Sequence, residues 1–123
     1  MISFTVPIRT YSEANRREHW AAKARRVKQQ RTAVALFWPK LADKLKPVIF
    51  GLTITLVRIA PRKLDDDNLV RSLKAVRDQV AKQLEINDGS DWPRWLYSQS
   101  QSKRRQYAVE VAIRSWEQPD GHP

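Results

Sequence analysis

The sequence predicts an α+β fold, in which helices pack on a small mixed β-sheet of about four strands. Four segments alternate apolar with polar residues, which is the period of a half-buried strand, and two longer segments carry apolar residues at the spacings of three and four that helices show. A chain of 123 residues is large enough for one hydrophobic core but not for two. We therefore expect a single domain over residues 1–116 and a disordered tail over residues 117–123.

The N-terminal third of the chain predicts a strand followed by a helix. Residues 2–8 alternate, but Pro7 cannot donate a backbone hydrogen bond, so this segment is expected to be an edge strand or to end at Val6. Ser12 is a favourable helix N-cap and Pro39 would stop a helix. The pattern therefore predicts one long helix between these two residues.

This helix is expected to have an apolar stripe and a basic remainder. Apolar residues recur along it at spacings of three, four and seven: Trp20, Ala24, Val27, Val34 and Phe37. Most other positions between 16 and 31 are basic, with Glu18 as the one acid: Arg16, Arg17, Lys23, Arg25, Arg26, Lys28 and Arg31. A solvated surface is the simpler interpretation of a charge run, but such one-sided charge favours contact with nucleic-acid phosphates. His19, beside Trp20, is more typical of a structural role.

The remaining strands are expected in the middle and at the end of the chain. Residues 48–59 give the strongest strand pattern, and its core face is expected to carry Phe50, Leu52, Ile54 and Leu56. Residues 95–99 predict a further short strand, and residues 107–114 predict the last one. The polar segment 100–106 between them is interpreted as a hairpin tip.

The second helix is expected from Asp67 to Leu84 or Glu85, before a turn at residues 87–89. Apolar residues at spacings of four and three cluster on one side of it: Leu69, Leu73, Val76, Val80 and Leu84. On a helical wheel, four charged residues fall within roughly 60° of one another on the opposite side: Asp67, Arg71, Lys74 and Asp78.

The charge of the chain favours a polyanionic partner. Lys and Arg number 23 against 13 Asp and Glu, and residues 1–60 alone hold 12 basic and 3 acidic side chains. Such a field attracts nucleic acid first and an anionic membrane surface second. The chain has no cysteine, which excludes disulfides and thiolate metal sites, and it lacks a signal-peptide pattern or an apolar stretch near the roughly 20 residues that span a bilayer. We therefore expect a soluble, cytoplasmic protein that does not enter a membrane.

Three consecutive carboxylates, Asp65, Asp66 and Asp67, interrupt this basic chain. One of them is expected to cap the second helix, but adjacent carboxylates repel each other, and a second or third adds little to a filled cap. A hard cation would neutralise the repulsion, and several aspartate oxygens suit Mg²⁺ or Mn²⁺. From the residues alone, a metal site and pure capping both stay open. Further carboxylates at Asp88 and Asp91 would join the cluster only by folding back or from a partner chain.

A metal ion held by carboxylates beside basic residues is an arrangement for phosphodiester hydrolysis. Lys74 and Arg71, on the Asp67 face of the helix, are the candidate cations for transition-state stabilisation. Other nucleophilic schemes lack their residues, since the chain has no cysteine, two histidines and no Gly-rich phosphate loop.

These motifs resemble the RusA family of Holliday-junction resolvases, in particular its phage and prophage members. The resemblance covers most of the chain and rests on five short motifs: Asp65-Asp66-Asp67-Asn68-Leu69, Lys74-Ala75-Val76-Arg77-Asp78, Asn87-Asp88-Gly89, Glu13-Ala14-Asn15 and Glu18-His19-Trp20. It implies a RusA-like, homodimeric endonuclease that uses Mg²⁺, with Mn²⁺ as a substitute. Such an enzyme cuts four-way DNA junctions by paired incisions in DNA recombination and repair.

The resemblance also implies roles for individual residues. Asp65, Asp67 and Asp88 match the metal ligands and catalytic carboxylates, which leaves Asp66 to capping or to the surface. Lys74 matches the catalytic lysine of the phage-type pattern.

Two positions leave the comparison open. Arg71 matches the lysine position of the founding pattern, and we interpret it as a phosphate contact. Asn87 stands where the family often has a second aspartate, so one acidic group is missing there. The alternative function is a non-catalytic protein that binds branched DNA or RNA. A basic scaffold or membrane-surface protein is the weakest alternative, because it leaves the aspartates unexplained.

Overall fold

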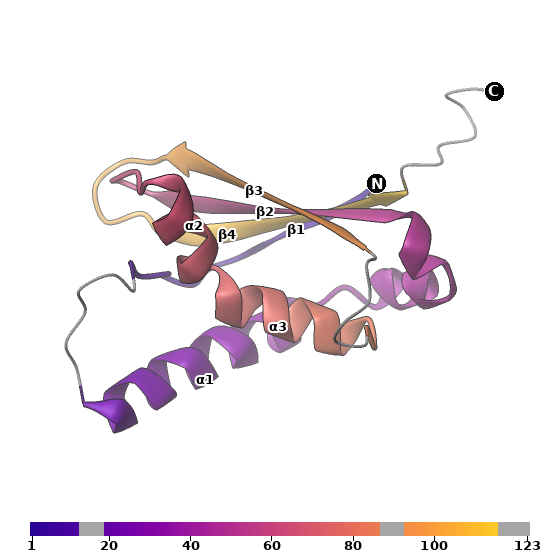
Figure 1. The fold of residues 1–123 in the computed structure, drawn as a ribbon, viewed down its shortest axis with the longest axis horizontal. Coiled ribbons are helices and arrows are strands. Elements are labelled where there is room, and N and C mark those ends of the chain that lie inside the picture. The colour runs from indigo at the N-terminus through magenta and orange to yellow at the C-terminus, as the bar shows by residue number, and fades with distance from the viewer. Residues whose placement is uncertain (13–18, 87–92, 116–123) are drawn as a thin grey trace.

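The computed structural model describes residues 1–12, 19–86 and 93–115, with the backbone alone for residues 48–50. These residues form two layers, a β-sheet and a set of helices that cover one of its faces (Figure 1). The elements, in chain order, are β1 (Ile2–Val6), α1 (Trp20–Phe37), the 3₁₀ segment η1 (Lys40–Gly51), β2 (Leu52–Ala60), α2 (Asp66–Ser72), α3 (Lys74–Gln83), β3 (Arg94–Gln101) and β4 (Ala108–Ser115). The expected α+β class is therefore confirmed. None of the helices in the described ranges has the length and apolarity that crossing a membrane requires.

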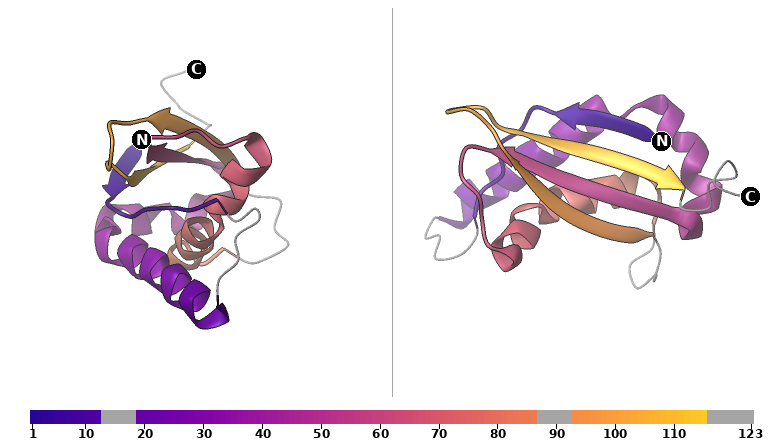
Figure 2. Two further views of the ribbon diagram at one scale, coloured as in Figure 1. Left: turned by 90° about the vertical axis from the view of Figure 1, so that its left-hand side faces the viewer. Right: turned by 90° about the horizontal axis from the view of Figure 1, so that it is seen from above.

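The sheet has four strands in the order β1-β4-β2-β3 and is mixed, as expected. β2 pairs in parallel with β3, and β4 is antiparallel to both β1 and β2. Figure 2 shows the strands from above, with the helices behind them. The interpretation of residues 100–106 as a hairpin tip is wrong, because β2 lies between β3 and β4 and the connection passes over its end. β1 is an edge strand that ends at Val6, before Pro7, as predicted.

The core lies between the sheet and the helices. Leu52, Ile54 and Leu56 of β2 are fully buried, which confirms these three members of the predicted inward face. The side chain of Phe50, the fourth member, lies outside the described part of the chain. β4 contributes Val109, Val111 and Ile113 to the same core. The strand begins at Leu52, however, and not at residue 48. Leu52 pairs with Ser115, the last residue of β4, so β2 begins where its partner ends, and the residues before it belong to η1.

The first helix is shorter than predicted. It begins at Trp20 and not at Ser12, and His19 is its N-cap, with Nδ1 accepting a hydrogen bond from the Ala21 amide at 3.2 Å. His19 therefore has the structural role that was expected. The end of the helix before Pro39 is confirmed.

The buried face of α1 differs from the predicted apolar stripe. Trp20 is 76% exposed and Phe37 is 45% exposed. The residues that the helix buries lie four apart: Arg26, Gln30 and Val34. Polar residues are accommodated there because they find partners in the segment after β1, and Gln30 Nε2 donates to the Arg9 carbonyl at 3.1 Å.

The predicted single helix from Asp67 to Leu84 is two helices that meet at Leu73. Leu73 has φ −100° and ψ 4°, outside the helical range, and Ser72 Oγ donates to the Leu69 carbonyl at 2.7 Å. A serine side chain that bonds a backbone carbonyl competes with helix continuation, which accounts for the break. The predicted apolar side is nevertheless confirmed, since all five of its members are buried: Leu69, Leu73, Val76, Val80 and Leu84.

The position of the core predicts unequal effects for two leucine substitutions. Leu56→Ala, at a fully buried position of β2, should lower the free energy of unfolding by about 2 to 5 kcal/mol through lost burial and a cavity. Leu96→Ala, on the edge strand β3 where the side chain is 50% exposed, should cost less than about 1 kcal/mol. Urea denaturation measures both, and equal losses would contradict this placement of the core.

Candidate functional site

The three aspartates lie where β2 has ended and α2 begins. Asp65 is the N-cap of α2, and its Oδ1 accepts a hydrogen bond from the Asn68 amide at 2.9 Å. Asp66 and Asp67 follow in the first helical turn, and all three side chains are exposed. The expectation that one of the three aspartates caps the helix is confirmed, and Asp66, which was expected at the cap or at the surface, is exposed in the first turn. The cap is Asp65 because its extended backbone, at φ −69° and ψ 168°, is the conformation from which a side chain reaches the first turn.

The backbone leading to the aspartates is held by the side chain of Gln99, on β3. Gln99 Oε1 accepts from the Leu64 amide at 2.9 Å, and Gln99 Nε2 donates to the Leu64 carbonyl at 2.8 Å. Gln101 Nε2 makes a further hydrogen bond to the Pro61 carbonyl at 3.0 Å. Two amide side chains thus bind residues 61–64 as a neighbouring strand would. The sequence analysis missed both glutamines, because their role depends on the parallel pairing of β2 and β3.

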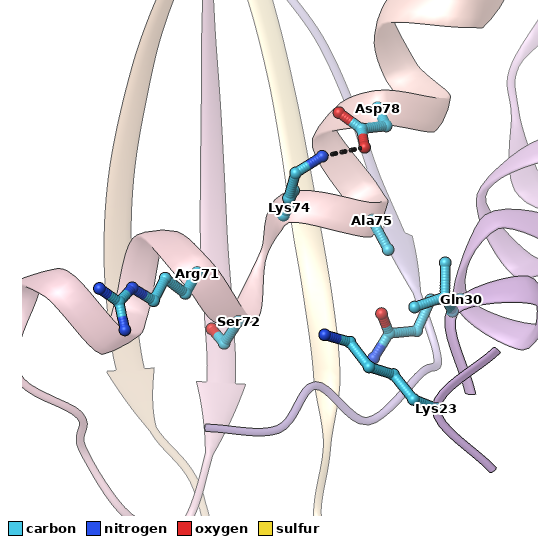
Figure 3. A pocket seen from close by; sticks show the side chains of 8 residues that line it. Lys23, Gln30, Arg71, Ser72, Lys74, Ala75 and Asp78 are labelled. Carbon is cyan, nitrogen blue, oxygen red and sulfur yellow. Dashed lines mark hydrogen bonds and ion pairs between the residues drawn. The ribbon is translucent and has the colours of Figure 1, made fainter. Parts of the chain in front are cut away.

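The basic residues of the second helical region surround a cavity of about 260 Å³ between α1, α2 and α3 (Figure 3). Arg71 and Lys74 line it together with Asp78, and Lys23 faces them from α1. Lys74 Nζ lies 2.8 Å from Asp78 Oδ2, whereas the guanidinium of Arg71 points away from this pair. The lysine charge is therefore partly neutralised, and the arginine charge is directed elsewhere.

The predicted four-residue charged face is only partly formed. Asp67 and Arg71 are four residues apart on α2, and so lie on one side of that helix. Lys74 and Asp78 have the same spacing on α3. Asp67 is not among the residues that line the cavity. The break at Leu73 separates the two pairs, so the expected continuous face becomes two short ones.

The predicted DNA-binding residues of α1 are divided by the structure. Lys23, Arg25 and Lys28 are exposed, as a surface that contacts phosphate requires. Arg26 is 7% exposed and lies over the Tyr11 ring, with its guanidinium carbon 5.1 Å from the ring centroid. Its side chain is thus packed inside the protein, unlike those of Lys23, Arg25 and Lys28, and its assignment as a DNA contact stays a prediction. Two further residues assigned to DNA binding lie outside the described residues: Arg16 and Arg17.

The described residues offer two of the three expected metal ligands. Asp65 keeps Oδ2 outside the cap bond, and Asp67 makes no hydrogen bond or ion pair with a described residue. These carboxylate oxygens fit the preference of Mg²⁺. Asp88, the third assigned ligand, and Asn87 lie outside the described residues. Within the ranges that are described, no group of three or more His, Cys, Asp or Glu side chains is placed to hold a metal ion.

Comparison of the sequence with models of known protein families gave no match, and comparison with curated proteins gave none.

The glutamine contacts predict a specific loss of stability. Gln99→Ala should lower the free energy of unfolding by about 1 to 3 kcal/mol, because it leaves the partly buried amide and carbonyl of Leu64 without their partner. Ser98→Ala, at an exposed neighbouring position, should change it by less than about 0.5 kcal/mol. Urea denaturation of both variants checks this, and a Gln99→Ala protein as stable as the parent would show that these bonds do not hold the segment.

Proposed function

We propose that this protein is a structure-selective endodeoxyribonuclease that resolves four-way DNA junctions by Mg²⁺-dependent hydrolysis and acts as a homodimer. The observation that carries the proposal is the exposed aspartate cluster, held on a fixed backbone at the start of α2, one helical turn before Arg71. The resemblance of its motifs to those of RusA resolvases gives the substrate. DNA recombination and repair are the processes in which such an activity is used.

Asp65 and Asp67 would hold the ion, which supplies an activated water and neutralises charge on the phosphate when bound. Asp65 would use Oδ2, since Oδ1 is engaged by Asn68. The cap bond fixes the Asp65 side chain, and the Gln99 contacts fix the backbone before it, so the Asp65 carboxylate does not have to be ordered by the substrate.

The exposed cations of α1, α2 and α3 would bind the DNA backbone. Lys23, Arg25 and Lys28 on α1 are exposed and can contact phosphates without reading bases. Arg71 lies one turn from Asp67 and would contact the phosphate beside the ion. Lys74, which is 76% exposed at its side chain, would stabilise the charge of the transition state after exchanging Asp78 for the phosphate.

A non-catalytic protein that binds branched DNA or RNA is the second candidate. It is favoured by the use of one Asp65 oxygen as a helix cap, because that oxygen is already engaged by the Asn68 amide. Its signature would be salt-sensitive binding that Mg²⁺ does not alter, because phosphate contacts alone would carry the affinity.

Cleavage of a synthetic four-way junction tests the proposal directly. The parent protein with Mg²⁺ should give paired, symmetric nicks, and Asp67→Asn should lose this cleavage while it retains junction binding. The matched control is Asp66→Asn, which makes the same charge change in the same turn and should still cleave. Absence of nicking by the parent protein would refute the nuclease, and loss of binding by Asp67→Asn would refute its role as a ligand.

Lys74 can be tested separately from the aspartates. Lys74→Met should lower the cleavage rate by roughly 10²-fold to 10³-fold, the usual effect of removing one charge-stabilising donor. Junction binding should weaken much less, because many phosphate contacts remain. Lys82→Met, which removes an exposed lysine from the last turn of the same helix, is the control. Single-turnover kinetics and gel-shift titrations give the two quantities, and equal effects of both variants on cleavage would contradict the assignment.

A further inference from the structure

A second basic site lies at the end of the sheet where β1, β2 and β3 finish and β4 starts. It is a pocket of about 500 Å³ lined by residues from three separate segments: the segment after β1, the connection from β2 to α2, and the turn between β3 and β4. Figure 1 shows these segments together at one end of the molecule. We call it the arginine pocket because five arginines line it: Arg9, Arg58, Arg62, Arg104 and Arg105. Leu64, which directly precedes Asp65, also lines it.

Among the described residues, the arginine pocket holds positive charge without carboxylate partners. None of the described residues that line it is acidic, and none of the five arginines forms an ion pair with a described residue. The side-chain contacts of Arg9 and Arg58 are with neutral groups. The guanidinium of Arg9 lies 4.8 Å from the Tyr11 ring centroid and 4.3 Å from that of Tyr107. Aromatic faces hold a guanidinium in position and leave its charge and edge N–H groups for an anion.

Arg58 is the buried member of the pocket, at 6% exposure. Its Nε donates to Thr10 Oγ1 at 3.1 Å, and its Nη1 donates to the Arg62 carbonyl at 2.7 Å. Burial and the charge of Arg9 lower the pKa of the Arg58 guanidinium. A buried cation beside other cations is unfavourable unless an anion compensates it. Both hydrogen-bond partners of Arg58 are neutral, so they do not compensate its charge.

The turn that supplies two of the arginines is strained. Arg105 has φ 65°, a left-handed conformation that costs a residue with a side chain roughly 1 to 2 kcal/mol and costs glycine almost nothing. The turn is fixed by Ser102, whose Oγ donates to the Gln106 carbonyl at 2.6 Å and whose amide donates to the Ala60 carbonyl at 3.0 Å. Arg105 thus carries a side chain at a position whose backbone would suit glycine.

We infer that the arginine pocket binds backbone phosphates of a DNA strand next to the aspartate cluster. One arginine guanidinium can donate two parallel hydrogen bonds to the oxygens of a phosphate. The volume of the pocket is also larger than the volume of a single phosphate group. The inference rests on the DNA-binding part of the proposed function and not on cleavage. The pocket would be a second place at which the protein holds the DNA strand. It includes Leu64, directly before Asp65, whereas Arg71 and Lys74 follow the aspartates in the chain.

Binding in EDTA, where no cleavage occurs, tests the pocket alone. The dependence of log K on log salt concentration is measured for a four-way junction with the full-length protein. Arg105→Gly should reduce the slope by about 1 and weaken binding several-fold, because one phosphate contact is lost. Its melting temperature should stay the same or rise, because glycine relieves the strain at φ 65°. Arg62→Gln combined with Arg105→Gly should reduce the slope by about 2.

Lys103→Gln is the matched control, since it removes one exposed charge from the same turn at a residue that does not line the pocket. It should change the slope by much less than Arg105→Gly. An unchanged slope for Arg105→Gly, or equal effects of the two variants, would overturn the inference. Inorganic phosphate, titrated as a separate probe, should bind only weakly; tight phosphate binding that Arg105→Gly abolishes while DNA binding persists would assign the pocket to a free anion and also overturn it. A parent protein that binds but does not cleave would refute the nuclease and leave the pocket standing.

Discussion

The parallel pairing of β2 and β3 is the constraint on which the rest of the structure depends. Parallel neighbours cannot be joined by a tight turn, so the chain must return along the whole sheet before β3 begins. α2 and α3 form this return, and they bring the apolar series from Leu69 to Leu84 onto the sheet. The same pairing sets the ends of β2 and β3 at one edge. Gln99 and Gln101 can therefore reach residues 61–64, and the aspartates follow directly from that segment.

Charge is separated over short distances at this end of the molecule. The aspartates lie at the start of α2, and Arg71 and Lys74 follow them. The arginine pocket includes Leu64, the residue directly before Asp65, and its arginines come from segments on both sides of the aspartates in the chain. Neutral groups hold much of this charge in place, as the Asn68 amide does for Asp65 and the tyrosine rings do for Arg9. A surface built in this way is suited to a partner with regularly spaced negative charges and bound counterions, such as a nucleic acid.

The local patterns predicted the strands and the buried helix side well, because alternation and spacings of three and four follow from backbone geometry alone. Leu52, Ile54, Leu56 and the series from Leu69 to Leu84 are buried as predicted. Strand partners are not encoded locally, and so the hairpin expected at residues 100–106 was wrong. The stripe of α1 was only partly right. Val34 is buried as predicted, but Trp20 and Phe37 are exposed, and Arg26 and Gln30 are buried against partners that only the folded chain provides.

The site was predicted in its residue types more than in its geometry. Three adjacent aspartates in a basic chain are a strong compositional signal, and the structure does place Asp65 and Asp67 together on the surface. Which aspartate caps α2 depends on where β2 ends and on the path of the chain after it, and this could not be predicted from the motif. Gln99 and the arginine pocket gave no signal, because their members come from segments that meet only through the sheet order.

Because α2 is short, the arrangement of the aspartate cluster depends on how long this helix stays folded. Isolated helices below about 12 residues are marginal in water, so the seven residues of α2 are ordered by the docking of Leu69, by the Asp65 cap and by the grip of Gln99 on Leu64. The non-helical Leu73 separates it from α3, which packs on α1. α2 can therefore open as a unit of its own while the rest of the fold persists. The Asp65 and Asp67 carboxylates then keep a fixed relative position only while α2 is folded. Hydrogen exchange of the Asn68 and Leu69 amides measures how often α2 unfolds.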